Sequence, residues 1–152
     1  IVPLIGADLE FFDMLVTDVN GTIKAGDKTY QWNTWADVLK PKAGTEVLAT
    51  YEDQFYKGKA AAVTRKLGKG SITYVGVESI NGDFERQIVR TIYDRANVTI
   101  EDLPKGVFVE WRDGFYVGVN YTSEAINLPI PKGSKIVVGQ NPLQPAQAVI
   151  WK

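Results

Sequence analysis

The sequence predicts an α+β fold, in which a layer of strands with one helix is followed by a small all-β sandwich domain. Three observations support this class. Short β-prone runs separated by glycines occupy residues 9–77. Residues 83–96 repeat apolar side chains at the helical period. From Pro104 onward only strand signals appear, and proline and glycine interrupt them.

The strands expected before the helix are recognised by β-branched and aromatic residues at half-buried spacing. Residues 45–51, Thr-Glu-Val-Leu-Ala-Thr-Tyr, are the clearest of them. Residues 60–65 and 71–77 flank a short polar connector with two glycines, which predicts a hairpin. Weaker strand patterns cover residues 9–16 and 22–31.

The helix expected over residues 83–96 is amphipathic. Its apolar residues recur at every fourth position, with two neighbours beside them: Phe84, Ile88, Val89, Ile92, Tyr93 and Ala96. Asn97 is a suitable left-handed terminator. A single amphipathic helix needs a sheet to cover, and the strands before it supply one.

A domain boundary is expected near residue 103, which divides the chain into residues 1–103 and 104–152. In the second domain, two strand-like runs at 107–112 and 115–121 are joined by Asp-Gly, a strong hairpin signal. Further short runs, separated by proline and glycine, lie at residues 125–130, 135–138 and 148–151. This pattern is typical of a small sandwich or open barrel.

The composition excludes several classes of function. The chain has a formal net charge of -1 and no concentrated run of Lys or Arg, so we expect no nucleic-acid partner. It contains neither Cys nor His, which removes disulfides, thiolate or imidazole metal sites and the commonest general base. Any catalysis by this chain would therefore have to use carboxylates, Lys, Tyr or Ser. We predict no catalytic residue, no bound metal and no cofactor.

The chain also lacks membrane and leader signals. No stretch reaches the roughly 18–20 apolar residues that span a bilayer, so we expect no membrane partner. The sequence begins at Ile1 without an initiator Met or a basic leader. This beginning favours a fragment of a longer protein over a small protein in its processed form.

Candidate functional residues are few. Without His, acid–base catalysis would need a pair of carboxyl groups that face one another. The nearest local pair, Glu52-Asp53, is expected to be a solvated loop charge, because adjacent extended residues point to opposite faces. Five aromatic residues are the remaining candidates for contact with a sugar or a neighbouring subunit, although packing is the favoured interpretation. They are Trp32, Trp35, Tyr51, Phe55 and Tyr56.

Two stretches resemble the C-terminal end of the glycoside hydrolase family 42 β-galactosidases. The first contains, in order, Leu48-Ala49, Tyr51, Tyr56, Gly58-Lys59, Ala62-Val63-Thr64-Arg65, Gly68-Lys69-Gly70 and Tyr74-Val75-Gly76. The second contains Pro104-Lys105-Gly106-Val107 and the run from Asp113 to Thr122. Each motif is short, but the ordered set spans roughly residues 30–152. Ala60 or Ala61 stands where the family usually has Pro.

The resemblance implies an architecture and a partner. Residues 1–103 correspond to the later part of the α/β, glutamine-amidotransferase-like domain that mediates trimer formation, and residues 104–152 to the C-terminal β-domain. The catalytic barrel of the parent enzyme, which cleaves terminal β-D-galactosides with retention and without a cofactor, carries both catalytic glutamates. The compartment stays open between bacterial cytoplasm and periplasm. A free-standing carbohydrate-binding or protein-interaction module is the alternative.

Overall fold

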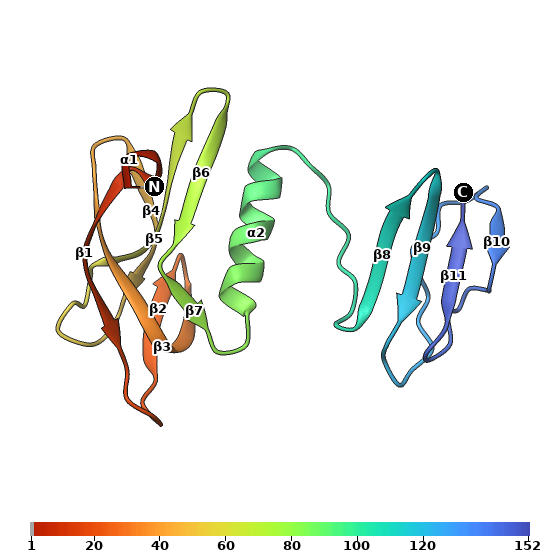
Figure 1. The fold of residues 1–152 in the computed structure, drawn as a ribbon, viewed down its shortest axis with the longest axis horizontal. Coiled ribbons are helices and arrows are strands. Elements are labelled where there is room, and N and C mark those ends of the chain that lie inside the picture. Colours follow the sequence, from red (N-terminus) through yellow and green to blue (C-terminus); the bar gives the residue numbers. More distant parts are fainter. Residues whose placement is uncertain (1) are drawn as a thin grey trace. The chain divides into compact units, whose positions relative to one another are not determined.

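The computed structural model describes residues 2–152, and the chain divides into two compact units between Thr99 and Ile100 (Figure 1). Each unit has its own sheet and its own apolar core. Neither helix in this described range has the length and apolar character needed to cross a membrane.

The first unit is built around a seven-stranded sheet with the order β1-β3-β2-β4-β5-β6, in which β7 also pairs with β3. Every pairing in this sheet is antiparallel. The elements are α1 (Val2–Ile5), β1 (Ala7–Met14), β2 (Gly21–Ala25), β3 (Lys28–Pro41), β4 (Thr45–Tyr51), β5 (Ala60–Leu67), β6 (Gly70–Val75), β7 (Val77–Ser79) and α2 (Asp83–Arg95).

Strand β3 organises this unit. It is 14 residues long and pairs with β1, β2, β5 and β7, and its residues contribute to both buried apolar clusters of the unit. Trp32 on β3 is fully buried there. A Cβ atom at Gly21, its partner on β2, would lie 2.4 Å from the Trp32 indole nitrogen, so only glycine leaves room for this ring.

Helix α2 covers part of this sheet, as the periodicity predicts. Phe84 and Ile88 are buried in the core. The Glu85 carboxylate accepts hydrogen bonds from the backbone N–H and the hydroxyl of Ser79, which ties the first turn of the helix to β7. Asn97 follows the helix in the left-handed conformation, with φ of 54°, so the expected terminator is confirmed.

The amidotransferase-like α/β layer is not seen in the described residues. A parallel α/β layer requires crossover connections between strands. Here every strand pairing is antiparallel, and the only helix longer than one turn in the described range comes after β7. The coarser prediction of a β-rich fold with two sheets is confirmed.

The second unit contains a four-stranded antiparallel sheet with the order β10-β11-β9-β8. Its strands are β8 (Val107–Arg112), β9 (Phe115–Asn120), β10 (Ile136–Val138) and β11 (Ala148–Trp151). Asp113 and Gly114 both have positive φ, 48° and 89°, as the tight hairpin requires. Leu143, Val149 and Trp151 lie in its core.

The expected sandwich needs a correction in this unit. Its described residues form one sheet, and the strand expected at 125–130 contributes only an isolated bridge between Ile126 and Leu143. Prolines explain the difference, because Pro129, Pro131 and Pro142 have no backbone N–H to donate to a ladder. Irregular segments therefore cover the sheet where a second sheet was expected.

Candidate functional site

The structure separates the five predicted aromatic residues into two groups. Trp32, Tyr51 and Tyr56 are at most 2% exposed, and their rings meet edge to face in the core. They present no surface to a sugar or a subunit, so the contact prediction is corrected for these three. Trp35 and Phe55 are 40% and 84% exposed, and the prediction stays open for them.

The buried tyrosines act as hydrogen-bond donors. The Tyr51 hydroxyl donates to the backbone carbonyl of Asp37 at 3.0 Å, and the Tyr56 hydroxyl donates to the Asp13 carboxylate at 2.8 Å. Burial raises the pKa of both phenols well above the ordinary value, and for Tyr56 the bond to Asp13 adds to the effect. Both hydroxyls are therefore neutral at physiological pH and have no capacity to act as bases there.

Asp37 connects the core to the surface. Its carboxylate accepts hydrogen bonds from the Trp35 indole N–H at 2.8 Å and from the Tyr74 hydroxyl. Burial and the bond to Asp37 raise the pKa of Tyr74 to about 12. The single polar group of the Trp35 ring thus points inward, and the exposed part of this ring is entirely apolar.

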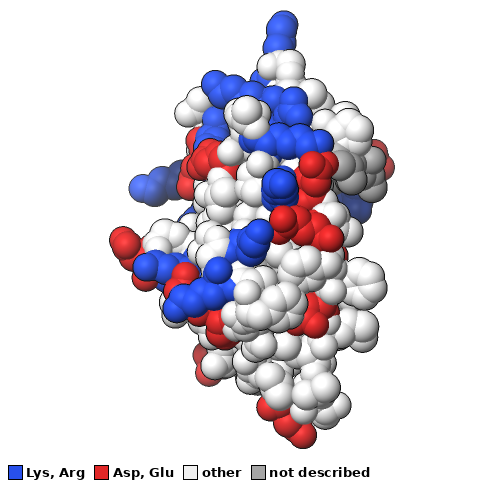
Figure 2. All heavy atoms as spheres, turned by 90° about the vertical axis from the view of Figure 1, so that its left-hand side faces the viewer, with Lys and Arg blue, Asp and Glu red and all other residues white. Residues whose placement is uncertain are grey.

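Beside Trp35, the C-terminal end of strand β1 carries exposed apolar side chains. Phe12 stacks on Trp35 with ring centroids 4.6 Å apart and an interplanar angle of 8°. Met14 lies opposite Trp35 in the β1–β3 register and is 59% exposed. Phe12, Met14 and Trp35 are called the β1 face below. In Figure 2, uncharged atoms occupy much of one half of the first unit, while Lys and Arg gather at the other end.

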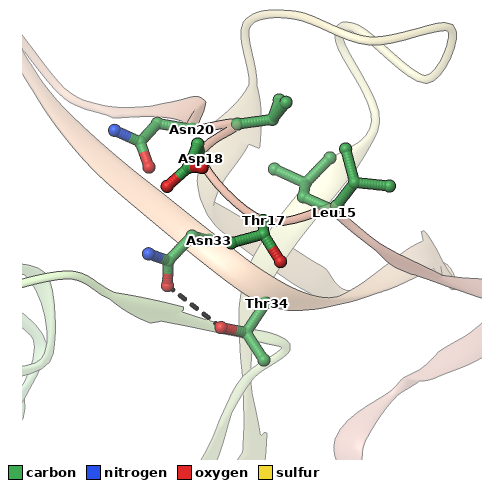
Figure 3. Close-up of a pocket in the computed structure, with 8 residues that line it drawn as sticks. Leu15, Thr17, Asp18, Asn20, Asn33 and Thr34 are labelled. Carbon is green, nitrogen blue, oxygen red and sulfur yellow. Dashed lines mark hydrogen bonds between the residues drawn. The ribbon is translucent and has the colours of Figure 1, made fainter.

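A polar pocket of about 560 Å³ adjoins this strand, formed by the loop after β1 and by the bend in β3 (Figure 3). Asp18 and Asn20 lie on its loop side, and Asn33 and Thr34 on its β3 side. Thr34 adopts φ of 72°, which is rare for a β-branched residue and marks a strained backbone. Asp18 is the one carboxylate in the lining, so this pocket does not offer the acid pair of a glycosidase.

A second pocket, of about 820 Å³, lies between the β5–β6 hairpin and the C-terminal end of α2. Arg65, Lys66, Lys69 and Arg95 line it. The only carboxylate there, Glu46, accepts two hydrogen bonds from Arg95 at 2.7 and 2.9 Å, and these bonds lower its pKa. The hairpin predicted around Gly68 is confirmed, with β5 and β6 paired from Ala62 to Leu67.

The acidic residues at the ends of β1 and β4 lie in unrelated surroundings. Glu10 pairs with Lys59 at 2.8 Å, whereas Asp13 accepts the bond from Tyr56. Glu52 and Asp53 are half-buried instead of solvated, and one Asp53 carboxylate oxygen is buried without a hydrogen-bond partner among residues 2–152. In residues 2–152, no group of three or more Asp and Glu side chains is arranged to hold a metal ion.

Comparison with known proteins identifies the family. A family model described as beta-galactosidase trimerisation domain matches residues 1–99. The chain belongs to this family. The match covers the whole first unit, and the relatives are family 42 β-galactosidases, so the resemblance found in the sequence motifs is confirmed.

Relatives extend the similarity of this trimerisation-domain chain into the second unit. The β-galactosidase BgaH of Haloferax lucentense is 30% identical over 142 residues, covering 93% of this chain and 21% of that protein. The β-galactosidase Bga of Halorubrum lacusprofundi is 30% identical over 141 residues, covering 85% of this chain and 20% of that protein. The chain spans about a fifth of the length of the curated relatives it matches.

Solved structures share the fold. The polyextremophilic β-galactosidase from the Antarctic haloarchaeon Halorubrum lacusprofundi superposes with a TM-score of 0.83 at 27% identity, covering 98% of this chain and 23% of that one. The β-galactosidase from Bacillus circulans sp. alkalophilus has a TM-score of 0.77 at 21% identity, covering 99% of this chain and 25% of that one. The second likeness shows the fold alone.

Proposed function

We propose that this chain is a non-catalytic C-terminal segment of a family 42 β-galactosidase and that it helps to hold the enzyme together as a homo-oligomer, a trimer. The match of residues 1–99 to the trimerisation-domain family carries the proposal. The coverage of about a fifth of the relatives supports it, because most of a relative lies outside the matched segment.

The proposed parent enzyme hydrolyses terminal β-D-galactosides with retention. Such a mechanism uses one carboxyl group as nucleophile and a second as acid and base. The resemblance assigns both groups to the catalytic barrel, which is this chain's proposed partner. The pocket beside Thr34 contains one carboxylate, that of Asp18. The pocket beside Lys69 also contains one, that of Glu46, which accepts hydrogen bonds from Arg95. These surroundings support a structural role.

The proposal also assigns each of the two domains to a part of the parent enzyme. Residues 1–103 act as the later part of the α/β trimerisation domain, and residues 104–152 act as the C-terminal β-domain. The amidotransferase-like layer then includes strands contributed by the preceding part of the parent.

Two measurements test this function. Purified residues 1–152 are expected to show no turnover of a chromogenic β-galactoside, and the parent enzyme is expected to have the mass of a trimer by light scattering. Deletion of residues 1–152 from the parent should abolish the trimer. Steady turnover by the isolated chain, or an unchanged trimer after the deletion, would sink the proposal.

A second candidate function is carbohydrate contact, and one observation favours it. Asp18, Asn20 and Asn33 line the polar pocket (Figure 3), and Trp35, which is 40% exposed, directly follows the lining residue Thr34 along the chain. Polar groups of this kind bind sugar hydroxyls, and an apolar ring surface packs against a pyranose face. Calorimetry with galactose, lactose and galactan, with Trp35→Ala as the comparison, tests it. No heat and unchanged Trp fluorescence would eliminate this candidate.

A further inference from the structure

We infer that Asn81 is a site of spontaneous covalent modification: the backbone nitrogen of Gly82 attacks the side-chain amide of Asn81, and the products are Asp and isoaspartate just before helix α2. Asn followed by Gly is the pair in which this ring closure is least hindered, because Gly has no Cβ atom beside the attacking nitrogen. The sequence contains this pair twice, at Asn20-Gly21 and at Asn81-Gly82. The structure separates the two copies.

The turn between β7 and α2 leaves room for the reaction at Gly82 (Figure 1). Asn81 is exposed, and Gly82 adopts φ of 74°. A Cβ atom added at Gly82 would meet nothing within 4 Å in the described part of the chain. The Gly82 N–H donates to the Ser79 carbonyl at 3.3 Å, which is longer than the usual distance of about 2.9–3.0 Å. The attacking nitrogen is therefore held only weakly.

Neighbouring groups prepare the Asn81 amide for attack. The backbone N–H of Asp83 donates to the Asn81 side-chain oxygen at 3.2 Å, and a donor at this position stabilises the negative charge that develops on the oxygen. The Asn81 amide N–H in turn donates to the Asp83 carboxylate. These bonds hold the side chain over the backbone that follows it. The amide carbon is thus kept close to the chain segment that supplies the nucleophile, and such proximity lowers the barrier.

The reaction balances with water alone. A base in solution removes the proton of the Gly82 nitrogen, which forms a bond to Cγ of Asn81. The bond from Cγ to the amide nitrogen breaks, and this nitrogen takes up a proton and leaves as ammonia. The product is a succinimide ring. Water then adds to either ring carbonyl and breaks the bond from that carbon to the ring nitrogen, which gives Asp or isoaspartate.

The other copy of the pair is protected by packing. Asn20 is also exposed and lies on the loop side of the polar pocket (Figure 3). Gly21, however, begins strand β2 and pairs with Trp32. A Cβ atom at Gly21 would lie 2.4 Å from the Trp32 indole nitrogen. Ring closure turns the peptide unit between Asn20 and Gly21, so it would press Gly21 against this ring or break the strand pairing.

Conversion of Asn81 changes the first turn of α2. A carboxylate at this position no longer donates to Asp83 and places a second negative charge beside it. Isoaspartate also adds a methylene group to the main chain, which displaces the acceptor of the Asp83 N–H. The bonds from Ser79 to Glu85 do not involve Asn81. The modification therefore loosens the start of the helix, whereas its attachment to β7 remains.

Peptide mapping of the proposed parent enzyme tests the inference. The folded enzyme is incubated at mildly alkaline pH in heavy-oxygen water and digested, and its peptides are separated and weighed by mass spectrometry. Asp and isoaspartate that carry the heavy oxygen are expected to accumulate at Asn81 about tenfold faster than at Asn20. This ratio corresponds to about 1.4 kcal/mol of activation free energy. Equal rates at the two sites in the folded enzyme, or no conversion at Asn81, would overturn the inference.

The unfolded enzyme is the control for the packing argument. Denaturant removes the contact between Gly21 and Trp32, so Asn20 and Asn81 are expected to convert at similar rates. If Asn20 stays slow in denaturant, the protection assigned to Trp32 is wrong.

Two further readouts test the role of Gly82. Asn81→Gln retains an amide but lengthens the side chain by one methylene group, so conversion at this position should nearly cease while that at Asn20 is unchanged. Isoaspartate forms only through the ring, so a product that consists of Asp alone would show direct hydrolysis and exclude attack by Gly82. In the converted enzyme, hydrogen exchange should rise in the first turn of α2; unchanged exchange there would contradict the loosening.

Discussion

The indole N–H of Trp35 donates a hydrogen bond of 2.8 Å to the Asp37 carboxylate, which lies two residues further along strand β3. Residues at this spacing point to the same side of a strand, so the bond needs no change in backbone. It orients an exposed ring by means of a carboxylate that is only 9% exposed. The order of the β1 face therefore depends on a group in the core.

Replacing that carboxylate should destabilise the first unit. In Asp37→Ala the N–H of Trp35 and the hydroxyl of Tyr74 lose their acceptor. A fully buried donor without a partner costs about 1–3 kcal/mol; both donors here are only partly buried and regain some water, so we expect the free energy of unfolding to fall by about 1–2 kcal/mol. Urea unfolding followed by Trp fluorescence measures this. Asp27→Ala, at an exposed turn, is the control; equal losses in both variants would contradict the role assigned to Asp37.

The close approach of Gly21 to Trp32 gives a second prediction. Gly21→Ala places a methyl group 2.4 Å from the indole nitrogen of a fully buried ring, so the core has to shift. Overpacking of this kind costs about 1–3 kcal/mol. Gly70→Ala is the matched control, because its Cβ atom would meet nothing nearer than 3.9 Å. Thermal unfolding should separate the two variants; a Gly21→Ala variant as stable as Gly70→Ala would refute the packing argument.

Alkaline pH should unfold the first unit. The pKa of Tyr74 is raised to about 12 from the value of 10.0 in the unfolded chain, and burial raises those of Tyr51 and Tyr56 as well. A raised folded-state pKa gives stability that is complete below the unfolded pKa and is lost as the pH rises through the folded pKa. For Tyr74 the loss therefore falls between pH 10 and about pH 12.

Unfolding curves across this pH range, with tyrosinate absorbance as the second signal, provide the measurement. Tyr74→Phe removes one of the contributing groups, so its stability should fall less steeply over the same range. Identical slopes for the variant and the wild type would show that the hydroxyl of Tyr74 is not coupled to folding.

The ion pair between Glu46 and Arg95 should contribute little to the free energy of unfolding, and only above acidic pH. Both side chains are about half exposed, and pairs of this kind contribute less than about 1 kcal/mol. The hydrogen bond from Arg95 lowers the pKa of Glu46, so the stabilisation is present above the unfolded pKa of 4.5 and is lost as pH falls through the folded pKa. Glu46→Gln should thus be slightly less stable at neutral pH and equal to the wild type in acid. A large loss at neutral pH would argue for a larger role of this pair.

Local sequence patterns were sufficient where neighbouring residues decide the structure. Strand β4 coincides with the predicted residues 45–51, and the helix predicted at 83–96 is observed from Asp83 to Arg95. Asp113-Gly114 forms the expected hairpin because both residues tolerate positive φ. In each case the signal is contained in a few consecutive side chains.

Strand β3 shows where such patterns are insufficient. Its segment from Trp32 to Trp35 has no regular alternation, because Trp32 faces the core, Thr34 bends the backbone and Trp35 returns to the surface. The sequence therefore did not reveal a continuous strand of 14 residues. The partners on four other strands, which lie far away along the chain, determine its course.

The sequence by itself determined the family, the positions of most strands along the chain, the single amphipathic helix and the absence of Cys and His chemistry, because these depend on residue type and on spacing along the chain. The tertiary structure alone decided which aromatic residues reach the surface. Trp32 and Trp35 have the same side chain and lie three positions apart in the sequence, yet Trp32 is fully buried and Trp35 is 40% exposed. The physical reason is long-range packing: Gly21 makes room for the first ring, whereas Phe12 and Asp37 hold the second at the edge of the sheet.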